Sequence, residues 1–155
     1  MPQIEYVTVA NHAEAINGLL YLQGAGLTDV MQPMDGSGAP GVVHIGLGVS
    51  LLVGWNETNR TYPMQMHIEH EDGDTVAIID ATVEAGRPAG LTPGSDQRHV
   101  LAISGEVQFA REGGYRVRAV IDGQERAVTF RVVRPATSGP VTRAGGPTDF
   151  DIPPL

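Results

Sequence analysis

The feature that most constrains the fold is a strict alternation of residue types along residues 42–53. Every second position there is apolar: Val43, Ile45, Leu47, Val49, Leu51 and Val53. The positions between them are His44, Gly46, Gly48, Ser50 and Leu52. Successive side chains of a β-strand point to opposite faces, so one of these two sets lines a core. The segment therefore predicts a long strand with one buried face.

Two Asp-Gly pairs predict hairpins, because this pair supplies the positive φ that a tight turn needs. Asp122-Gly123 would join residues 115–121 to 128–132, and Asp72-Gly73 would join 62–70 to 75–83. Further strands are predicted at residues 4–10, 19–23 and 100–109, and the only candidate for a helical turn is 12–16. About eight strands predict an all-β chain, folded as an antiparallel β-sandwich; a barrel is the alternative.

Composition excludes several classes of function. The net charge of −8 argues against binding to nucleic acid or to an anionic membrane surface. The chain has no Lys and no Cys, which excludes a Schiff-base lysine, a thiolate nucleophile and a disulfide framework. No apolar run approaches the roughly 20 residues of a membrane span, and no signal-peptide pattern opens the chain. We therefore expect a soluble, cytoplasmic protein whose partners are proteins or small molecules.

The last segment differs in composition from the rest of the chain. Residues 134–155 are rich in Pro and Gly, which neither continue a sheet nor form a helix. We place a domain boundary there, with a β-sandwich domain at 1–133 and an extended arm at 134–155. Its few apolar side chains offset little of the entropy cost of ordering it, so a receiving surface is needed to hold it. We expect Phe150, Ile152 and Leu155 to dock into a groove on the same domain or on a neighbouring copy.

Residues 64–74 combine two imidazoles with several carboxylates and suggest a metal site. His67, Glu69 and Glu71 share one face of the predicted strand. Same-face neighbours lie about 7 Å apart, too far to share one ion without help from a second strand. We therefore predict no metal site and no cofactor.

No catalytic motif fits its expected structural context. Residues 36–41 spell a dinucleotide-binding pattern, but a strand follows instead of the helix that pattern requires. Ser50 lies inside a predicted strand rather than on a nucleophile elbow. If the chain were an enzyme, its best residues would be His67, His70, Asp96 and His99. We expect a protein that is not an enzyme.

Three further features could mark an interaction surface. Trp55 is the only tryptophan and lies at a strand end. Gly46 and Gly48 leave a smooth strip on the polar face of residues 42–53, where either the domain itself or a second chain approaches closely. Two long loops, 54–60 and 86–97, are the natural places for a ligand.

The loop segments 52–60 and 86–98, the opening hairpin around 18–24 and the closing hairpin 114–130 resemble a family of uncharacterised bacterial single-domain proteins, a domain of unknown function. The resemblance spans roughly residues 3–133. It implies a bacterial, cytoplasmic protein with an immunoglobulin-like β-sandwich, and it brings no catalytic residue.

The sequence thus leads to two hypotheses about function. The first is a non-catalytic structural or interaction module that self-associates, or docks on a larger host assembly, through its arm. The alternative is a module that binds a sugar, a small molecule or calcium with loops 54–60 and 86–97.

Overall fold

A computed structural model describes residues 1–136 of the 155-residue chain. The described part is all-β, as the alternation predicts. Its strands are β1 (Gln3–Ala10), β2 (His12–Ile16), β3 (Leu19–Gln23), β4 (Asp29–Met31), β5 (Val43–Val53), β6 (Arg60–His70), β7 (Thr75–Ala85), β8 (Gln97–Val107), β9 (Gly113–Ile121) and β10 (Gln124–Val133). A short 3-10 turn, Trp55–Glu57, follows β5. None of the described elements is a helix able to cross a membrane.

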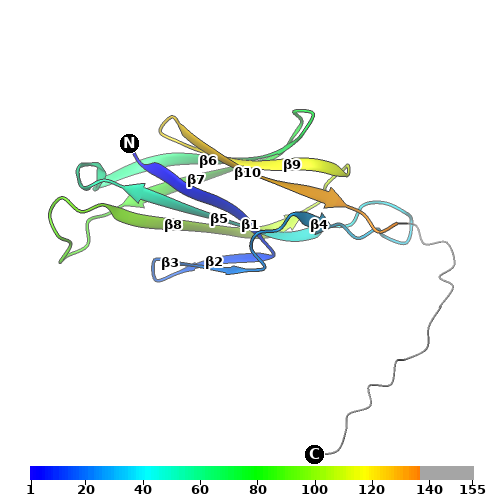
Figure 1. Cartoon of the computed structure of the whole chain (residues 1–155), viewed down its shortest axis with the longest axis horizontal. Helices are drawn as coiled ribbons and strands as arrows, with labels where there is room; N and C mark the ends of the chain where they lie inside the picture. The colour runs from blue at the N-terminus through cyan, green and yellow to red at the C-terminus, as the bar shows by residue number, and fades with distance from the viewer. Residues whose placement is uncertain (137–155) are drawn as a thin grey trace, which may run out of the picture.

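Two sheets pack face to face. One has the order β1-β5-β8, and the other has the order β4-β10-β9-β6-β7. In Figure 1, β6, β7, β9 and β10 lie above β5 and β8. All pairings are antiparallel except the short parallel pairing of β4 with β10. The chain therefore passes back and forth between the two sheets. As a result, neighbouring strands and loops at each end of the strands come from segments that are distant in the sequence.

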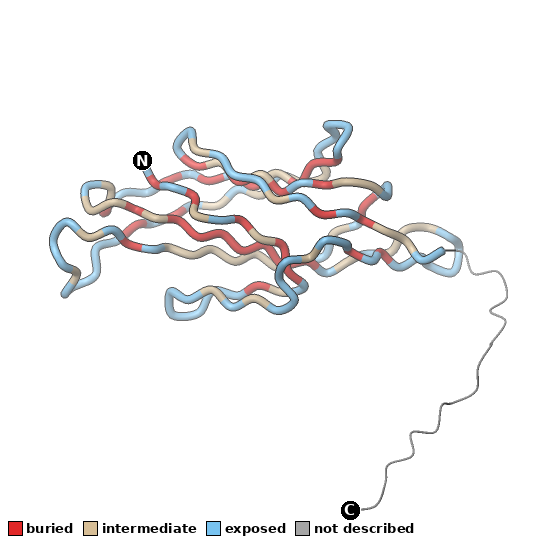
Figure 2. The backbone as a smooth tube through the Cα atoms, viewed as in Figure 1, coloured by how far each residue is buried: buried red, intermediate tan, exposed pale blue. Residues whose placement is uncertain are grey.

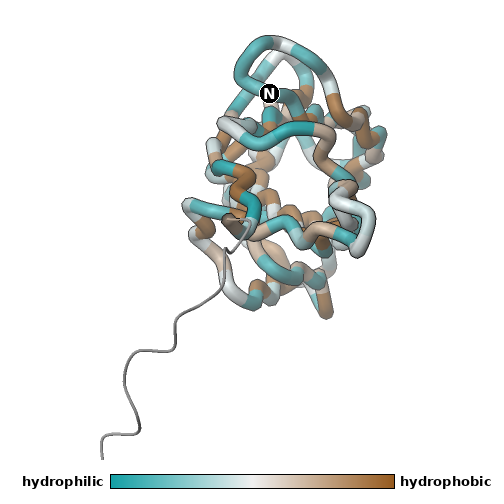
Figure 3. The backbone as a smooth tube through the Cα atoms, turned by 90° about the vertical axis from the view of Figure 1, so that its right-hand side faces the viewer, coloured by the Kyte–Doolittle hydropathy of each residue, from teal (hydrophilic) through white to brown (hydrophobic). Residues whose placement is uncertain are grey.

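The core fills the space between the two sheets. The strand predicted at residues 42–53 is confirmed as β5, and its inward residues from Ile45 to Val53 are buried (Figure 2). The expectation of a single buried face is wrong, because Gly46, Gly48 and Ser50 between them are buried as well. Viewed along the strands, the two sheets curve around this core (Figure 3). The largest fully buried side chain is Phe109, which belongs to the loop after β8, although the sequence predicted it as the end of a strand.

Residues 12–16 correct the sequence interpretation. They form β2, which pairs with β3 in a hairpin, and they contain no helical turn. The turn is Asn17-Gly18, with φ of 51° and 75°, the left-handed values of a tight hairpin turn. The hairpin lies beneath β5 and β8 in Figure 1, as a third layer on the outer face of the smaller sheet.

Each sheet ends in a long edge strand that is paired on one side only. Among residues 1–136, β7 pairs only with β6, and β8 pairs only with β5. Both strands have eleven residues. The sandwich is thus open along the side on which β7 and β8 lie.

Candidate functional site

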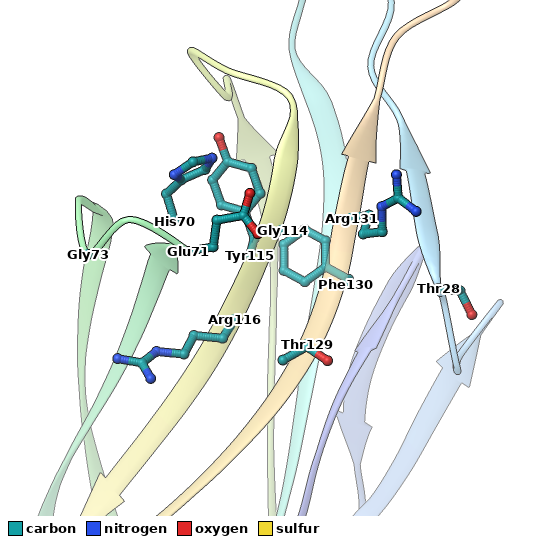
Figure 4. A pocket seen from close by; sticks show the side chains of 10 residues that line it. All are labelled: Thr28, His70, Glu71, Gly73, Gly114, Tyr115, Arg116, Thr129, Phe130 and Arg131. Atoms are coloured by element: carbon teal, nitrogen blue, oxygen red, sulfur yellow. The ribbon is translucent and has the colours of Figure 1, made fainter.

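A hollow of about 520 Å³ opens on the outer face of the five-stranded sheet, at the end where β10 finishes (Figure 4). Its floor is made by β9 and β10, on which outward residues alternate with buried ones. The β6–β7 turn and the segment before β4 form its walls. The lining residues are Thr28, His70, Glu71, Gly73, Gly114, Tyr115, Arg116, Thr129, Phe130 and Arg131.

Glu71 is held over the floor of this hollow. Its backbone N–H donates to the carbonyl oxygen of Gly114 at 2.9 Å. A Cβ atom added to Gly114 would lie only 2.6 Å from Glu71 Oε2. Glycine at position 114 therefore leaves room for the Glu71 carboxylate.

The two arginines of the hollow differ in their partners. Arg116 pairs with Glu69, and Arg118 pairs with the other oxygen of the same carboxylate at 2.8 Å. Hydrogen bonds from Arg118 and, to a smaller extent, from Arg116 lower the pKa of the buried Glu69 to about 2. Within residues 1–136, Arg131 forms no ion pair, so its guanidinium is the cation of the hollow that no described carboxylate neutralises.

His70 lies behind the hollow and joins two loops. Its Nδ1 is 2.7 Å from Asp72 Oδ1, and its Nε2 is 3.2 Å from the carbonyl oxygen of Glu112. Both neighbours are acceptors, so the imidazolium form can donate to both. The Asp72 carboxylate is the main cause of the raised pKa of His70, and in turn the His70 hydrogen bond is the main reason that the pKa of Asp72 falls to about 2.

The loop at residues 108–112 is tied to its surroundings on three sides. Arg111 pairs with Asp72, and the Tyr115 hydroxyl donates to the Arg111 carbonyl oxygen at 2.6 Å. Arg134 donates from its backbone N–H to Glu112 Oε1 at 2.8 Å and from its guanidinium to Ala110 O at 2.9 Å. The residue at which the arm begins is therefore fixed to the end of the sandwich.

The raised pKa of His70 gives stability a pH dependence. The imidazole of the unfolded chain has a pKa of about 6.5. The contribution of His70 to the free energy of unfolding is therefore fully present below that pH and is lost as pH rises through the raised pKa of the folded state. We expect the urea midpoint of the wild type to fall over this window and that of His70→Gln to fall less. His67→Gln is the control, and an equal effect of both variants would contradict the assignment to His70.

The imidazole beside the hollow is engaged at both of its nitrogens. Both nitrogens of His70 are taken by acceptors, so this imidazole is not available to remove a proton from a substrate. The lining offers the Glu71 carboxylate, two guanidiniums and two threonine hydroxyls, and the rings of Tyr115 and Phe130 lie buried beneath its floor.

The candidate metal ligands take other roles. Glu69 is ion-paired with Arg116 and Arg118, and Glu71 lies over Gly114. His67 lies in register with Ile78 and Arg118. No group of three or more His, Asp or Glu side chains within residues 1–136 is arranged to hold an ion.

The candidate catalytic residues are not brought together. Asp96 and His99 lie where β8 begins, opposite the end of β5, whereas His70 lies at the far end of β6. The burial of His99 lowers its pKa. The four residues therefore share no common cleft.

Trp55 joins the two long loops. The Arg87 guanidinium carbon lies 3.9 Å from the centre of the Trp55 ring, and Arg87 also donates to the Trp55 carbonyl oxygen at 2.8 Å. This cation–π contact between loops 54–60 and 86–97 occupies one face of Trp55. A hollow of about 120 Å³ lies beside these loops, well below the volume of the hollow at the other end.

The glycine strip is covered by the chain itself. A Cβ atom added to Gly46 would lie 2.5 Å from Ala13 N, and one added to Gly48 would lie 2.9 Å from a methyl group of Leu22. Hairpin β2–β3, rather than a second chain, makes the close approach at these glycines. Phe150, Ile152 and Leu155 lie outside the described residues.

Sequence reasoning did not identify Glu112 as a partner of His70 or Arg111 as a partner of Asp72. It also did not identify Arg134 as the residue that fixes the start of the arm. Their roles depend on which loops the sheet pairing brings together, and no local pattern marks them. It also missed the contact between His12 and His44, which lie 32 positions apart.

The model of a protein family, described as a family of unknown function (DUF6941), matches residues 5–133. The match begins within β1 and ends with the last residue of β10. No curated protein gives a significant match to the chain.

Proposed function

The chain belongs to this family of unknown function, and from that premise we propose that it is a non-catalytic interaction module that self-associates through its C-terminal arm. The arm, residues 134–155, reaches from one copy into the hollow on the five-stranded sheet of a neighbouring copy. The family match ends at residue 133, one residue before the proposed arm.

The hollow is the observation that carries this proposal. It combines the Arg131 guanidinium with Thr28, Thr129 and the backbone of Gly114, while the rings of Tyr115 and Phe130 are buried beneath it. Near its end the arm has the complementary pattern, with Asp149 and Asp151 flanking Phe150. Carboxylates beside Arg131 and an aromatic ring against the apolar part of the hollow would bind together, with the charges setting the direction of the peptide.

The root and the length of the arm also support docking on a neighbour. Arg134 is held by Glu112 and by the Ala110 carbonyl oxygen, so the arm leaves from a fixed point. Residues 137–155 are nineteen residues, and an extended chain spans about 3.3 Å per residue, or roughly 60 Å in all. This length is sufficient to cross to a second copy.

We also propose that the sandwich is immunoglobulin-like. Support comes from the order β1-β5-β8 facing β10-β9-β6-β7, with sequential strands exchanging sheets. The hydrogen bond from the Tyr115 hydroxyl, near the start of β9, to the Arg111 carbonyl oxygen resembles the tyrosine corner of such domains. A bacterial and cytoplasmic setting is proposed on the sequence resemblance alone, without a cofactor and without nucleic acid or membrane as partner.

Sedimentation velocity on the full chain over a range of concentrations tests this function. We expect the wild type to exceed the mass of one chain and the deletion of residues 135–155 to return it to one chain. Arg131→Glu should weaken association at least tenfold, because it places like charges opposite Asp149 and Asp151.

Arg60→Glu is the matched control, since Arg60 is an exposed arginine at the other end of the sandwich. A charge exchange, Arg131→Glu with Asp149→Arg and Asp151→Arg, should restore association. A wild type that is monomeric throughout, or a deletion that leaves the oligomer unchanged, rules the proposal out. In the first case the free arm peptide would be tested on a larger host assembly.

A further inference from the structure

Two histidines from different layers of the fold meet at the surface. His12 begins β2 in the hairpin, and His44 is the second residue of β5. They meet because the backbone of β2 lies directly on Gly46, two residues after His44. His12 Nδ1 and His44 Nε2 are 3.3 Å apart.

The Glu14 carboxylate sets the tautomer of His12, so that the nitrogen facing His44 is a hydrogen-bond acceptor. Glu14 Oε1 lies 2.9 Å from His12 Nε2, and a carboxylate only accepts, so Nε2 carries the proton. In the neutral ring Nδ1 then presents its lone pair toward His44. A carboxylate behind a metal-binding histidine is the usual way in which proteins orient such a ring.

The spacing of the two nitrogens fits a shared ion. Two ligands about 2.0–2.1 Å from one zinc ion at a tetrahedral angle are about 3.3 Å apart. The His12 and His44 nitrogens have this separation, and their rings are inclined by only 21° with centres 5.6 Å apart. The separation of the centres equals the nitrogen separation plus the two ring radii, so the nitrogens face each other directly, as donor and acceptor of a hydrogen bond in the metal-free protein. A shared ion therefore requires a small rotation of both rings and loss of the proton from His44 Nε2.

We propose that His12 Nδ1 and His44 Nε2 bind one divalent transition-metal ion of the class that prefers imidazole, namely zinc, nickel or copper(II). Glu14 orients His12. Residues 1–136 hold no preformed group of three ligands, so water completes the coordination. A further carboxylate, Glu106, lies directly opposite His44 in the register of β5 and β8.

The bound ion would join the hairpin to the smaller sheet. His12 belongs to the hairpin and His44 to the sheet that the hairpin covers. An ion that needs both residues therefore stabilises the contact between these two layers. This role is independent of the arm and of the hollow on the opposite sheet.

Isothermal titration of tag-free full-length protein with Zn²⁺ and with Ni²⁺ tests the site. We expect one ion per chain, with affinity falling at least tenfold in His12→Ala and in His44→Ala. Glu14→Gln should weaken binding by a smaller factor, because it acts through His12. His67→Ala, a change of an imidazole on the other sheet, should leave binding unchanged.

The thermal midpoint provides a second readout. Zn²⁺ should raise it in the wild type and in His67→Ala but not in His12→Ala or His44→Ala. The proposal is overturned if the wild type binds neither metal, if His12→Ala or His44→Ala retains wild-type affinity, or if His67→Ala loses as much affinity as they do.

Discussion

Gly46→Ala should lower the free energy of unfolding by about 2–3 kcal/mol, in the upper range for overpacking a tight contact. The added methyl group would lie 2.5 Å from Ala13 N and 2.6 Å from the His12 carbonyl carbon. Both are backbone atoms, so no side-chain rotation relieves the clash. The hairpin β2–β3 would have to move away from β5, which also breaks the hydrogen bonds that Ala13 makes with the Ser104 hydroxyl.

Urea unfolding measures the loss, and amide hydrogen exchange along residues 12–23 shows where it arises. Gly105→Ala is the control, because Gly105 lies on neighbouring β8 and a Cβ atom there meets nothing within 4 Å. That variant should be neutral or slightly stabilising, since glycine costs entropy inside a strand. Equal losses in the two variants would show that the close approach of the hairpin is not the cause.

Phe109→Ala should be more damaging still, with a loss of about 3–5 kcal/mol typical of a buried aromatic ring. The side chain is fully buried, and its ring packs edge-on against Tyr115 and Phe130, with centres 4.8 and 5.9 Å away. Loss of the Phe109 ring would leave a cavity directly behind the hollow and loosen loop 108–112. Arg134, which contacts the carbonyl oxygens of this loop, would lose its fixed position.

The measurement is again unfolding by urea, combined with the near-ultraviolet circular dichroism of the aromatic cluster. Phe109→Leu keeps most of the volume and should lose far less than Phe109→Ala. If both variants lost the same amount, the ring would not be packed as described. The Phe109→Ala variant should also associate more weakly, because both the hollow and the root of the arm depend on this loop.

Local patterns were sufficient to predict most of the sheet. The alternation along β5 gave its inward face correctly, and Asp122-Gly123, with φ of 46° and 76°, forms the predicted tight turn. β2 was missed because five residues containing two alanines and a glutamate show no strand pattern of their own. They are extended because they pair with β3 and lie on Gly46.

The candidate site was predictable only in part. The inward position of His70 follows from the alternation of β6, and His70 is indeed buried. Its partner Glu112 lies 42 positions away in a loop that reaches His70 only because β6 pairs with β9. The spacing of residues along the chain does not predict such a long-range contact. The contact between His12 and His44 could not be predicted for the same reason.

Among residues 1–136, the edge strands β7 and β8, each eleven residues long, leave one row of backbone donors and acceptors without a strand partner at one side of the molecule. The chain has no lysine with which to shield them, and β7 carries only Asp80 and Glu84 as charged residues. Exposed Ile78 lies between them and the β6–β7 turn. Polymerisation of concentrated protein would therefore begin on this flank, and its carboxylates make acidification, rather than added alkali, the condition that promotes it.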